Sequence, residues 1–243
     1  MKPWPYPKWI AHRGAGKLAP ENTLAAFQLG AQHGYRMFEC DAKLSSDGVV
    51  FLLHDEQLER TTNGTGVAGS HEWSHLSQLD AGSWHSKAYA GEALPSLEGI
   101  AKFCISHGYF LNIEIKPTPG TEAMTGAIVA KEALRLWQGE SIPPLLTSFK
   151  TEALVAAKKN APLLPRGLLL HSLWDGWLEA ALELECSCIV CNYKLWDKNL
   201  VATVHAQKMR CLSYTVNEQS NADTLIALGT DGIITDSVDR LGE

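Results

Sequence analysis

Residues 37–55, MFECDAKLSSDGVVFLLHD, decide the fold, because two short apolar runs flank a polar turn in this stretch. Side chains of an extended strand alternate between its two faces, so Glu39 and Asp41 project from the same face. Two carboxylates on one face are a pair of hard oxygen ligands. The segments that can add functional groups to this pair are His12-Arg13, His54-Asp55 and Glu114-Ile115-Lys116.

The link between the two apolar runs is too short for a parallel crossover. Only residues 42–48 separate the predicted strands 37–41 and 49–53, whereas a crossover between parallel strands needs about a dozen residues or more. We therefore predict an antiparallel hairpin with its turn at residues 45–48. Symmetrical pairing about that turn predicts that Glu39 lies opposite His54.

Outside this stretch, short apolar runs alternate with helical patterns, which is typical of a parallel sheet covered by helices. Nine strands are predicted, at residues 9–11, 37–41, 49–53, 111–115, 145–148, 167–170, 188–191, 211–215 and 232–235. Seven helices are predicted, at residues 22–33, 96–107, 121–138, 150–160, 174–185, 197–207 and 218–228. Because the hairpin accounts for the ninth strand, the other eight predict a (β/α)8 TIM barrel; a hairpin within the barrel wall is the alternative.

One segment departs from this alternation. Residues 56–95 are rich in Gly, Ser, Thr, His and Trp and have only a weak helical pattern near residues 72–79. Loops longer than about 12–15 residues are uncommon in a compact domain and are often functional. We expect residues 1–243 to form a single TIM-barrel domain, in which residues 56–95 are an insertion over the C-terminal face of the barrel.

The composition limits the classes of partner. A 45% hydrophobic and 20% charged chain with a net charge of −6 is typical of a globular protein, and it favours neither nucleic acid nor stable membrane insertion. The N-terminus has no apolar run suited to export, so a cytoplasmic location is expected. The six cysteines lie mostly in apolar runs, and Cys186, Cys188 and Cys191 lack a second ligand cluster, so packing is expected of them rather than metal binding.

Polar residues occur where the buried barrel strands end. His12 and Arg13 follow the first strand, and Glu114 and Lys116 alternate at the end of the strand NIEIK. The carboxyl ends of barrel strands gather at one rim, so these groups are expected to meet the Glu39 and Asp41 pair. Structural ion pairs are the alternative explanation for any one residue, and a shared site is favoured for the whole set.

This set of residue types predicts phosphate chemistry. The carboxylates of Glu39, Asp41 and Glu114 suit a hard divalent cation, Mg²⁺ or Ca²⁺. His12 and His54 offer acid–base groups that titrate near neutral pH. Arg13 and Lys116 offer positive charge for an anionic substrate.

Five ordered motifs resemble those of the glycerophosphodiester phosphodiesterase family, especially its cytosolic bacterial members linked to glycerol-3-phosphate uptake. They cover nearly the whole chain and comprise AHRGAGKLAPENTLAAF from residue 11, FECDAKLSSDGVVFLLHD from residue 38, NIEIKP from residue 112, YTVN from residue 214 and DGIITD from residue 231. The chain departs from the family pattern at Tyr214, where the usual residue is tryptophan.

The resemblance implies a role for each site residue. Glu39, Asp41 and Glu114 would bind the metal, His12 and His54 would be the acid–base pair, and Arg13 and Lys116 would hold the phosphate. Glu21 and Asn22 are expected to support the rim, and Cys40 is expected to face away from its neighbours and pack.

The expected activity is metal-dependent hydrolysis of small glycerophosphodiesters to glycerol 3-phosphate and an alcohol. The alternatives are a non-catalytic phosphodiester-binding barrel and a related barrel phospholipase or lyase. The preferred alcohol, the cation used in the cell, the first attacking group and the oligomeric state are left open by the residues.

Overall fold

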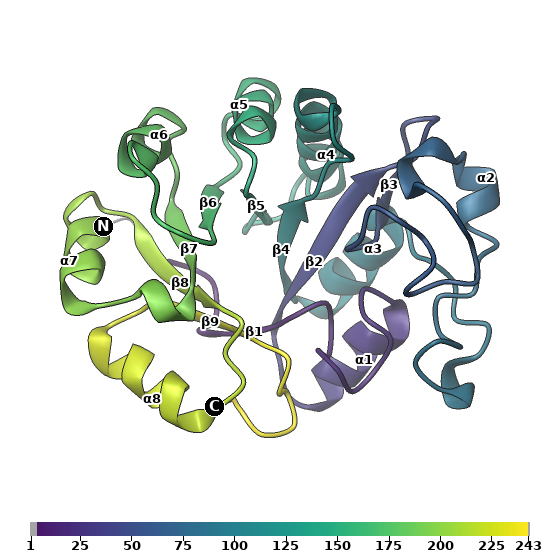
Figure 1. Cartoon of the computed structure of the whole chain (residues 1–243), viewed down its shortest axis with the longest axis horizontal. Coiled ribbons are helices and arrows are strands. Elements are labelled where there is room, and N and C mark those ends of the chain that lie inside the picture. Colours follow the sequence, from purple (N-terminus) through teal and green to yellow (C-terminus); the bar gives the residue numbers. More distant parts are fainter. Residues whose placement is uncertain (1–3, 243) are drawn as a thin grey trace.

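The computed structural model describes residues 4–242, and a ring of eight parallel strands lies at its centre (Figure 1). β1 pairs with both β9 and β2, which closes the ring. The predicted TIM barrel is thereby confirmed, although residues 1–3 and 243 of the predicted domain lie outside the described part. In spatial order the ring strands are β1 (Trp9–Ala11), β9 (Gly232–Thr235), β8 (Arg210–Tyr214), β7 (Cys188–Asn192), β6 (Arg166–Leu170), β5 (Leu145–Ser148), β4 (Phe110–Ile115) and β2 (Met37–Leu44).

Helices surround the ring, and each predicted helix has a counterpart whose ends lie within three residues of the prediction. Side-chain caps define several starts: Thr23, Ser96 and Asp197 each accept a hydrogen bond from a backbone N–H of the first turn. No helix within residues 4–242 has both the length and the apolar character needed to cross a bilayer. The helices are α1 (Leu24–Gln32), α3 (Leu97–His107), α4 (Glu122–Leu136), α5 (Thr151–Asn160), α6 (Trp177–Glu183), α7 (Lys198–Ala206) and α8 (Gln219–Leu228), with a 3-10 helix, η3 (Tyr193–Leu195).

Strand β2 shows how the alternation of side chains creates the site. Met37 points inward into an apolar cluster that fills the barrel interior, whereas Phe38 and Cys40 belong to the cluster between strands and helices. Glu39 and Asp41 share the inward face of Met37 and lie farther along the strand. The barrel interior therefore changes from apolar to acidic along β2, and Cys40 packs as expected.

The predicted hairpin is present, with β3 (Val50–Leu52) antiparallel to β2 and outside the ring. The predicted register was wrong by one residue. Ala42 pairs with Leu52, so continuing this register places His54 opposite Cys40 rather than opposite Glu39, and the strand pairing stops at Leu52.

The turn explains this difference. Gly48 has a φ of 86° and donates its backbone N–H to the carbonyl of Ser45 at 3.0 Å, so the predicted turn at residues 45–48 is present. Ser45 also donates its backbone N–H to the carbonyl of Val49 at 3.0 Å. The loop therefore holds one residue more than symmetrical pairing assumed, and one added residue shifts the register by one.

Residues 56–95 form a small unit beside the hairpin, with its own apolar cluster built on Leu58, Leu76 and Leu79. Its short helices are η1 (Ala68–Ser70), α2 (Trp73–Leu76) and η2 (Lys87–Tyr89). Contacts join this unit to α1 and to the segment that precedes it: Glu92 accepts a hydrogen bond from the backbone N–H of Ala25 in α1 at 3.0 Å, and His85 contacts the carbonyl of Lys17 at 3.0 Å.

Helices α4 and α5 pack closely because α4 carries a glycine where they meet. A Cβ at Gly126 would lie 2.1 Å from the carbonyl oxygen of Ala153 in α5.

We predict that Gly126→Ala lowers the free energy of unfolding by about 1–3 kcal/mol, as overpacking does. Gly99→Ala in α3 is the matched control, because only the Ser96 hydroxyl lies near its added Cβ, at 3.6 Å. Denaturant unfolding should show no decrease in the free energy of unfolding for the control. An equal decrease for both substitutions would contradict the packing argument.

Candidate active site

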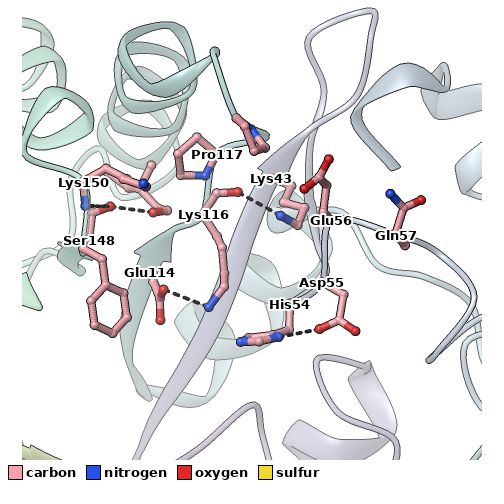
Figure 2. Close-up of a pocket in the computed structure, with 13 residues that line it drawn as sticks. Lys43, His54, Asp55, Glu56, Gln57, Glu114, Lys116, Pro117, Ser148 and Lys150 are labelled. Carbon is pink, nitrogen blue, oxygen red and sulfur yellow. Dashed lines mark hydrogen bonds and ion pairs between the residues drawn. The ribbon is translucent and has the colours of Figure 1, made fainter. Parts of the chain in front are cut away.

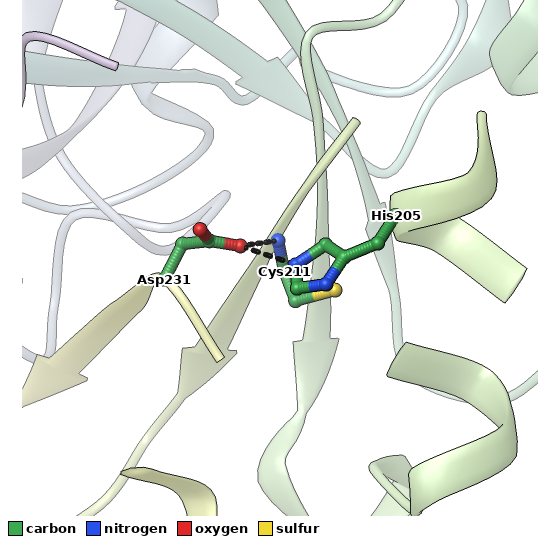
Figure 3. Close-up of side chains that lie close together, drawn as sticks. All are labelled: His205, Cys211 and Asp231. Carbon is green, nitrogen blue, oxygen red and sulfur yellow. Dashed lines mark hydrogen bonds and ion pairs between the residues drawn. The ribbon is translucent and has the colours of Figure 1, made fainter. Parts of the chain in front are cut away.

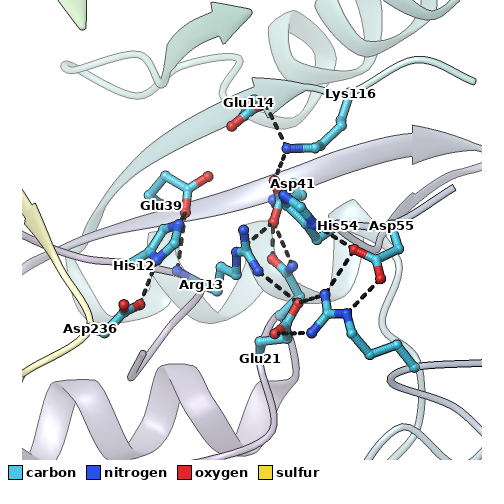
Figure 4. Close-up of polar contacts among 12 residues, drawn as sticks. His12, Arg13, Glu21, Glu39, Asp41, His54, Asp55, Glu114, Lys116 and Asp236 are labelled. Carbon is cyan, nitrogen blue, oxygen red and sulfur yellow. Dashed lines mark hydrogen bonds and ion pairs between the residues drawn. The ribbon is translucent and has the colours of Figure 1, made fainter. Parts of the chain in front are cut away.

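Three carboxylates converge at the carboxyl ends of β2 and β4. Asp41 and Glu114 are neighbours across the two strands, and Glu39 lies two residues before Asp41 on the same face. One oxygen from each of the three lies within 4.8 Å of the others (Figure 4). The three residues that the sequence predicted as metal ligands are therefore brought together.

Burial makes this cluster electrostatically costly. Burial, followed by the neighbouring charge of Asp41, raises the pKa of Glu39 to about 8. Burial and Asp41 also raise the pKa of Glu114. The Oε1 atom of Glu39 is buried and has no hydrogen-bond partner among the described residues. Such a carboxylate oxygen lacks the compensation that buried charges normally have.

Two cations lie against the carboxylates. The Arg13 Nε atom is 3.1 Å from Asp41 Oδ2, and the Lys116 Nζ atom is 3.0 Å from Glu114 Oε1 and 3.3 Å from Asp41 Oδ1. Burial raises the pKa of Asp41, but Arg13 and Lys116 outweigh it and hold that pKa far below its ordinary value. Both predicted phosphate-binding residues therefore lie in the cluster.

His12 follows β1 and is held by a carboxylate from the end of β9. Its Nδ1 atom lies 2.6 Å from Asp236 Oδ1, and its Nε2 atom lies 3.8 Å from Glu39 Oε2. Asp236 in turn accepts a hydrogen bond from the Asn217 side chain at 2.9 Å. Burial lowers the pKa of His12, but Asp236 and Glu39 outweigh it and the pKa is raised overall.

His54 is held in a similar way from the hairpin. Its Nδ1 atom lies 2.6 Å from Asp55 Oδ1 (Figure 4). Burial lowers the pKa of His54, and Arg13 and Lys116 lower it further, whereas Asp41 opposes them. Each histidine thus has its Nδ1 bound to an aspartate, which leaves Nε2 for a reacting group.

Arg60, from residues 56–95, fixes the aspartate beside His54. Its guanidinium contacts both oxygens of Asp55, at 2.5 and 2.9 Å, and both oxygens of Glu21, at 2.7 and 2.8 Å. Glu21 also accepts a hydrogen bond from Arg13 at 2.9 Å. Two bidentate pairs on one arginine hold the hairpin against the segment that precedes α1.

The segment between β1 and α1 adds a support below Asp41. The Asn22 side chain donates to Asp41 Oδ2 at 2.9 Å and accepts from the Asp41 backbone N–H at 3.1 Å. Arg13 and Asn22 have φ values of 52° and 62°, a left-handed conformation that costs on the order of 1 kcal/mol or more per residue. These contacts agree with the supporting role expected for Glu21 and Asn22.

A cavity of about 180 Å³ opens between the carboxylates and the opposite barrel wall. The Tyr214 ring lies on that wall, where its hydroxyl donates a hydrogen bond to the carbonyl of Leu170 at 3.0 Å. The centroids of the Tyr214 and Phe149 rings are 5.8 Å apart, in an edge-to-face arrangement. The cavity is lined by His12, Arg13, Glu39, His54, Asn112, Glu114, Lys116, Thr147, Phe149, Leu169, Tyr214, Thr215 and Ile234.

A second cluster, His205, Cys211 and Asp231, lies at the amino ends of β8 and β9, opposite the carboxylate cluster (Figure 3). Its carboxylate is already neutralised: Asp231 contacts His205 at 2.8 Å, Arg210 at 2.8 Å and the Cys211 backbone N–H at 2.8 Å. Burial raises the pKa of the Cys211 thiol, which disfavours the thiolate that metals bind. This cluster connects α7 to the amino-terminal end of the barrel.

All six cysteines are free and buried.

Fold and geometry together give a TIM barrel with a candidate active site at the carboxyl ends of its strands. The chain belongs to the glycerophosphoryl diester phosphodiesterase family, whose model matches residues 12–240. The sequence resemblance to this family is thereby confirmed.

Individual relatives match along almost the whole chain. A glycerophosphodiester phosphodiesterase of Caldanaerobacter subterraneus is 32% identical over 237 residues, which cover 96% of this chain and 95% of the relative. One of Bacillus subtilis is 28% identical and covers 95% of this chain and 83% of the relative. A solved phosphodiesterase of Oleispira antarctica, in complex with the product sn-glycerol-3-phosphate, has a TM-score of 0.90 and 34% identity, covering 97% of this chain and 95% of the other.

Sequence reasoning missed three supporting residues. Asp236 was visible within DGIITD and Asp55 beside His54, but nothing in their spacing showed that they hold the histidines. Arg60 lies in a segment without periodicity, and its contacts with Glu21 join residues 39 positions apart. Only the tertiary structure reveals these links.

Arg60→Lys tests the link between the insertion and His54. Lysine keeps the charge but loses the planar double bidentate contact. We expect the kcat for glycerophosphodiester hydrolysis to fall about tenfold or more, as when a group that orients a catalytic histidine is removed. The matched control is Arg135→Lys, because Arg135 makes a bidentate contact with Glu132 on the outside of α4, at 2.6 and 2.8 Å. Equal kinetics of the two variants would contradict the proposed link.

Proposed function

We propose that this protein hydrolyses small glycerophosphodiesters to sn-glycerol 3-phosphate and an alcohol. The observation that carries the proposal is the convergence of three carboxylates, two aspartate-held histidines and two cations around one cavity. The Oleispira antarctica protein, which has the same fold and 34% identity, supports this substrate class because its solved structure holds sn-glycerol-3-phosphate.

The carboxylate cluster fits a hard divalent cation, Mg²⁺ or Ca²⁺. The unpartnered Oε1 atom of Glu39 and the raised pKa values of Glu39 and Glu114 are the features that a bound cation would relieve. Glu39, Asp41 and Glu114 are the proposed ligands. When bound, the cation would supply positive charge to the non-bridging oxygens of the phosphate.

The other residues bind the phosphate and move protons. Arg13 and Lys116 provide N–H donors for its oxygens, in reach of the same cavity. A new P–O bond forms to the attacking oxygen as the P–O bond to the alcohol breaks. His12 and His54 share the proton transfers, one taking the proton of the attacking oxygen and the other giving a proton to the departing alcohol. Their pKa values shift in opposite directions, which supports such a division.

Three further proposals concern the domain organisation, the location in the cell and a link to glycerol-3-phosphate uptake. We propose a single domain in which residues 56–95 lie over the C-terminal face; the contacts of Arg60 and His85 with the segment before α1 and of Glu92 with α1 support this. Six free, buried cysteines support the proposed cytoplasmic location. The proposed association with glycerol-3-phosphate uptake rests on the sequence resemblance to the cytosolic bacterial members of the family.

The histidine roles predict a large loss of activity without a loss of fold. Hydrolysis of glycerophosphoethanolamine by His12→Ala and by His54→Ala should fall by about 10²- to 10⁴-fold, the usual contribution of acid–base catalysis. His33→Ala, at the end of α1, is the control and should keep its turnover. Circular dichroism should match the wild type for all three. Near-wild-type turnover of both site variants would disprove the assignment.

The same assay with a chelator separates the alternative functions. Loss of hydrolysis on chelation and recovery with Mg²⁺ or Ca²⁺ is the expected outcome for the proposed enzyme. A non-catalytic binding barrel would show no hydrolysis under any condition. A phospholipase or lyase would prefer lipid-bound diesters or would release a cyclic phosphate.

Glu39→Gln tests the cation site without an activity readout. The pKa of Glu39 is raised from 4.5 to about 8 in the folded protein. Between these pH values the unfolded chain releases the Glu39 proton more readily than the folded protein, so the free energy of unfolding falls as the pH rises. Without a divalent cation, the melting temperature of the variant minus that of the wild type should therefore increase from pH 5 to pH 8.

At pH 8, Mg²⁺ or Ca²⁺ should raise the melting temperature of the wild type and have little effect on Glu39→Gln. Glu183→Gln, an exposed change on α6, is the control and should follow the wild type. A cation response that Glu39→Gln leaves intact would exclude Glu39 as a ligand.

A further inference from the structure

A second, larger cavity of about 530 Å³ adjoins the catalytic one. The two cavities share His54, Glu114 and Lys116, so both open onto the groups proposed to handle the phosphate. A phosphodiester has two ester groups, which extend from the phosphorus in different directions. The smaller cavity suits the glycerol that all these substrates have in common, and the larger cavity is left for the alcohol that varies.

The larger cavity is bordered by a buried lysine, Lys43, that forms no ion pair among residues 4–242. Lys43 is the next inward-facing residue of β2 after Asp41, and its side chain is only 2% exposed. Its Nζ atom donates a hydrogen bond to the Lys116 carbonyl at 3.2 Å (Figure 2), and no carboxylate within residues 4–242 forms an ion pair with it. An ammonium has three N–H donors, so Lys43 can still bind an anionic group.

The balance of unpaired charge in this cavity is positive. Lys150, before α5, is exposed on the same cavity, and Figure 2 shows it on the other side of Lys116 from Lys43. The carboxylates of Asp55 and Glu114 are engaged by Arg60 and Lys116, respectively. Glu56 is the one acidic side chain of this wall without an ion pair among residues 4–242. Such a cavity, in a chain with a net charge of −6, favours an anionic occupant.

We propose that this cavity binds the departing alcohol and selects alcohols that carry an anionic group, with Lys43 as the main contact and Lys150 as a second. The proposal rests on the proposed hydrolysis of glycerophosphodiesters. Serine is the smallest suitable test alcohol, because its carboxylate can meet Lys43 while its ammonium can meet Glu56. Lys43 is thus a specificity-determining residue for the alcohol arm.

The test compares glycerophosphoserine with glycerophosphoethanolamine, which differ by one carboxylate. We expect the wild type to have the higher kcat/KM for the serine ester. Lys43→Met should lower the serine-to-ethanolamine ratio of kcat/KM about tenfold or more, as loss of a charged hydrogen-bond partner does. Lys150→Met should lower it severalfold because its side chain is exposed. Lys159→Met, exposed at the end of α5, is the matched control and should leave the ratio unchanged.

A binding measurement separates recognition from turnover. In the His12→Ala background, calorimetry should show that Lys43→Met weakens glycerophosphoserine binding at least tenfold more than glycerophosphoethanolamine binding. A wild-type preference for the ethanolamine ester, or ratios that neither lysine variant changes, would overturn the proposal while leaving the hydrolysis intact. Failure of the wild type to hydrolyse either ester would instead overturn the proposed function. Melting temperatures of the lysine variants show whether each is folded.

Discussion

The mutual repulsion of three converging carboxylates, two of them buried, is the constraint on which the site depends. Strand register places Asp41 beside Glu114, and alternation along β2 places Glu39 on the same face. Burial removes the water that would screen these charges, so they need cations. Arg13 and Lys116 compensate Asp41 well and Glu39 poorly, as the opposite shifts of the two pKa values show. The uncompensated carboxylate of Glu39 is the feature on which the proposed cation site rests.

The histidines are fixed from two different parts of the chain. Asp236 reaches His12 from the end of β9, next to β1 in the closed ring, whereas Asp55 reaches His54 from the hairpin outside the ring. Ring closure therefore orients one imidazole. The other imidazole depends on Arg60, so the segment of residues 56–95 helps to position a side chain of the candidate active site.

The sequence predicted the barrel and its helices, and it predicted that seven polar side chains would meet at one rim, because strand alternation and strand ends are local features. The hairpin register was mispredicted, since Gly48 and the Ser45 contacts lengthen the turn by one residue, which a count of polar residues does not reveal. The supports of the histidines could not be predicted, because Asp236 and Arg60 act through contacts between distant parts of the chain. Lys43 lay in the predicted link of residues 42–48 and was not among the predicted site residues; its burial beside a cavity is what distinguishes it.

The outer strand of the hairpin, β3, lies outside the closed ring and leads into the long segment of residues 56–95. The two ends of the insertion are held together, because Phe51 bridges Ser96 and the backbone N–H of Leu52 donates to the carbonyl of Pro95 at 3.0 Å. Lengthening a loop whose ends are already joined costs little entropy. A change in the length of this segment should therefore leave the ring of strands in place, provided that the segment keeps an arginine able to join Asp55 to Glu21.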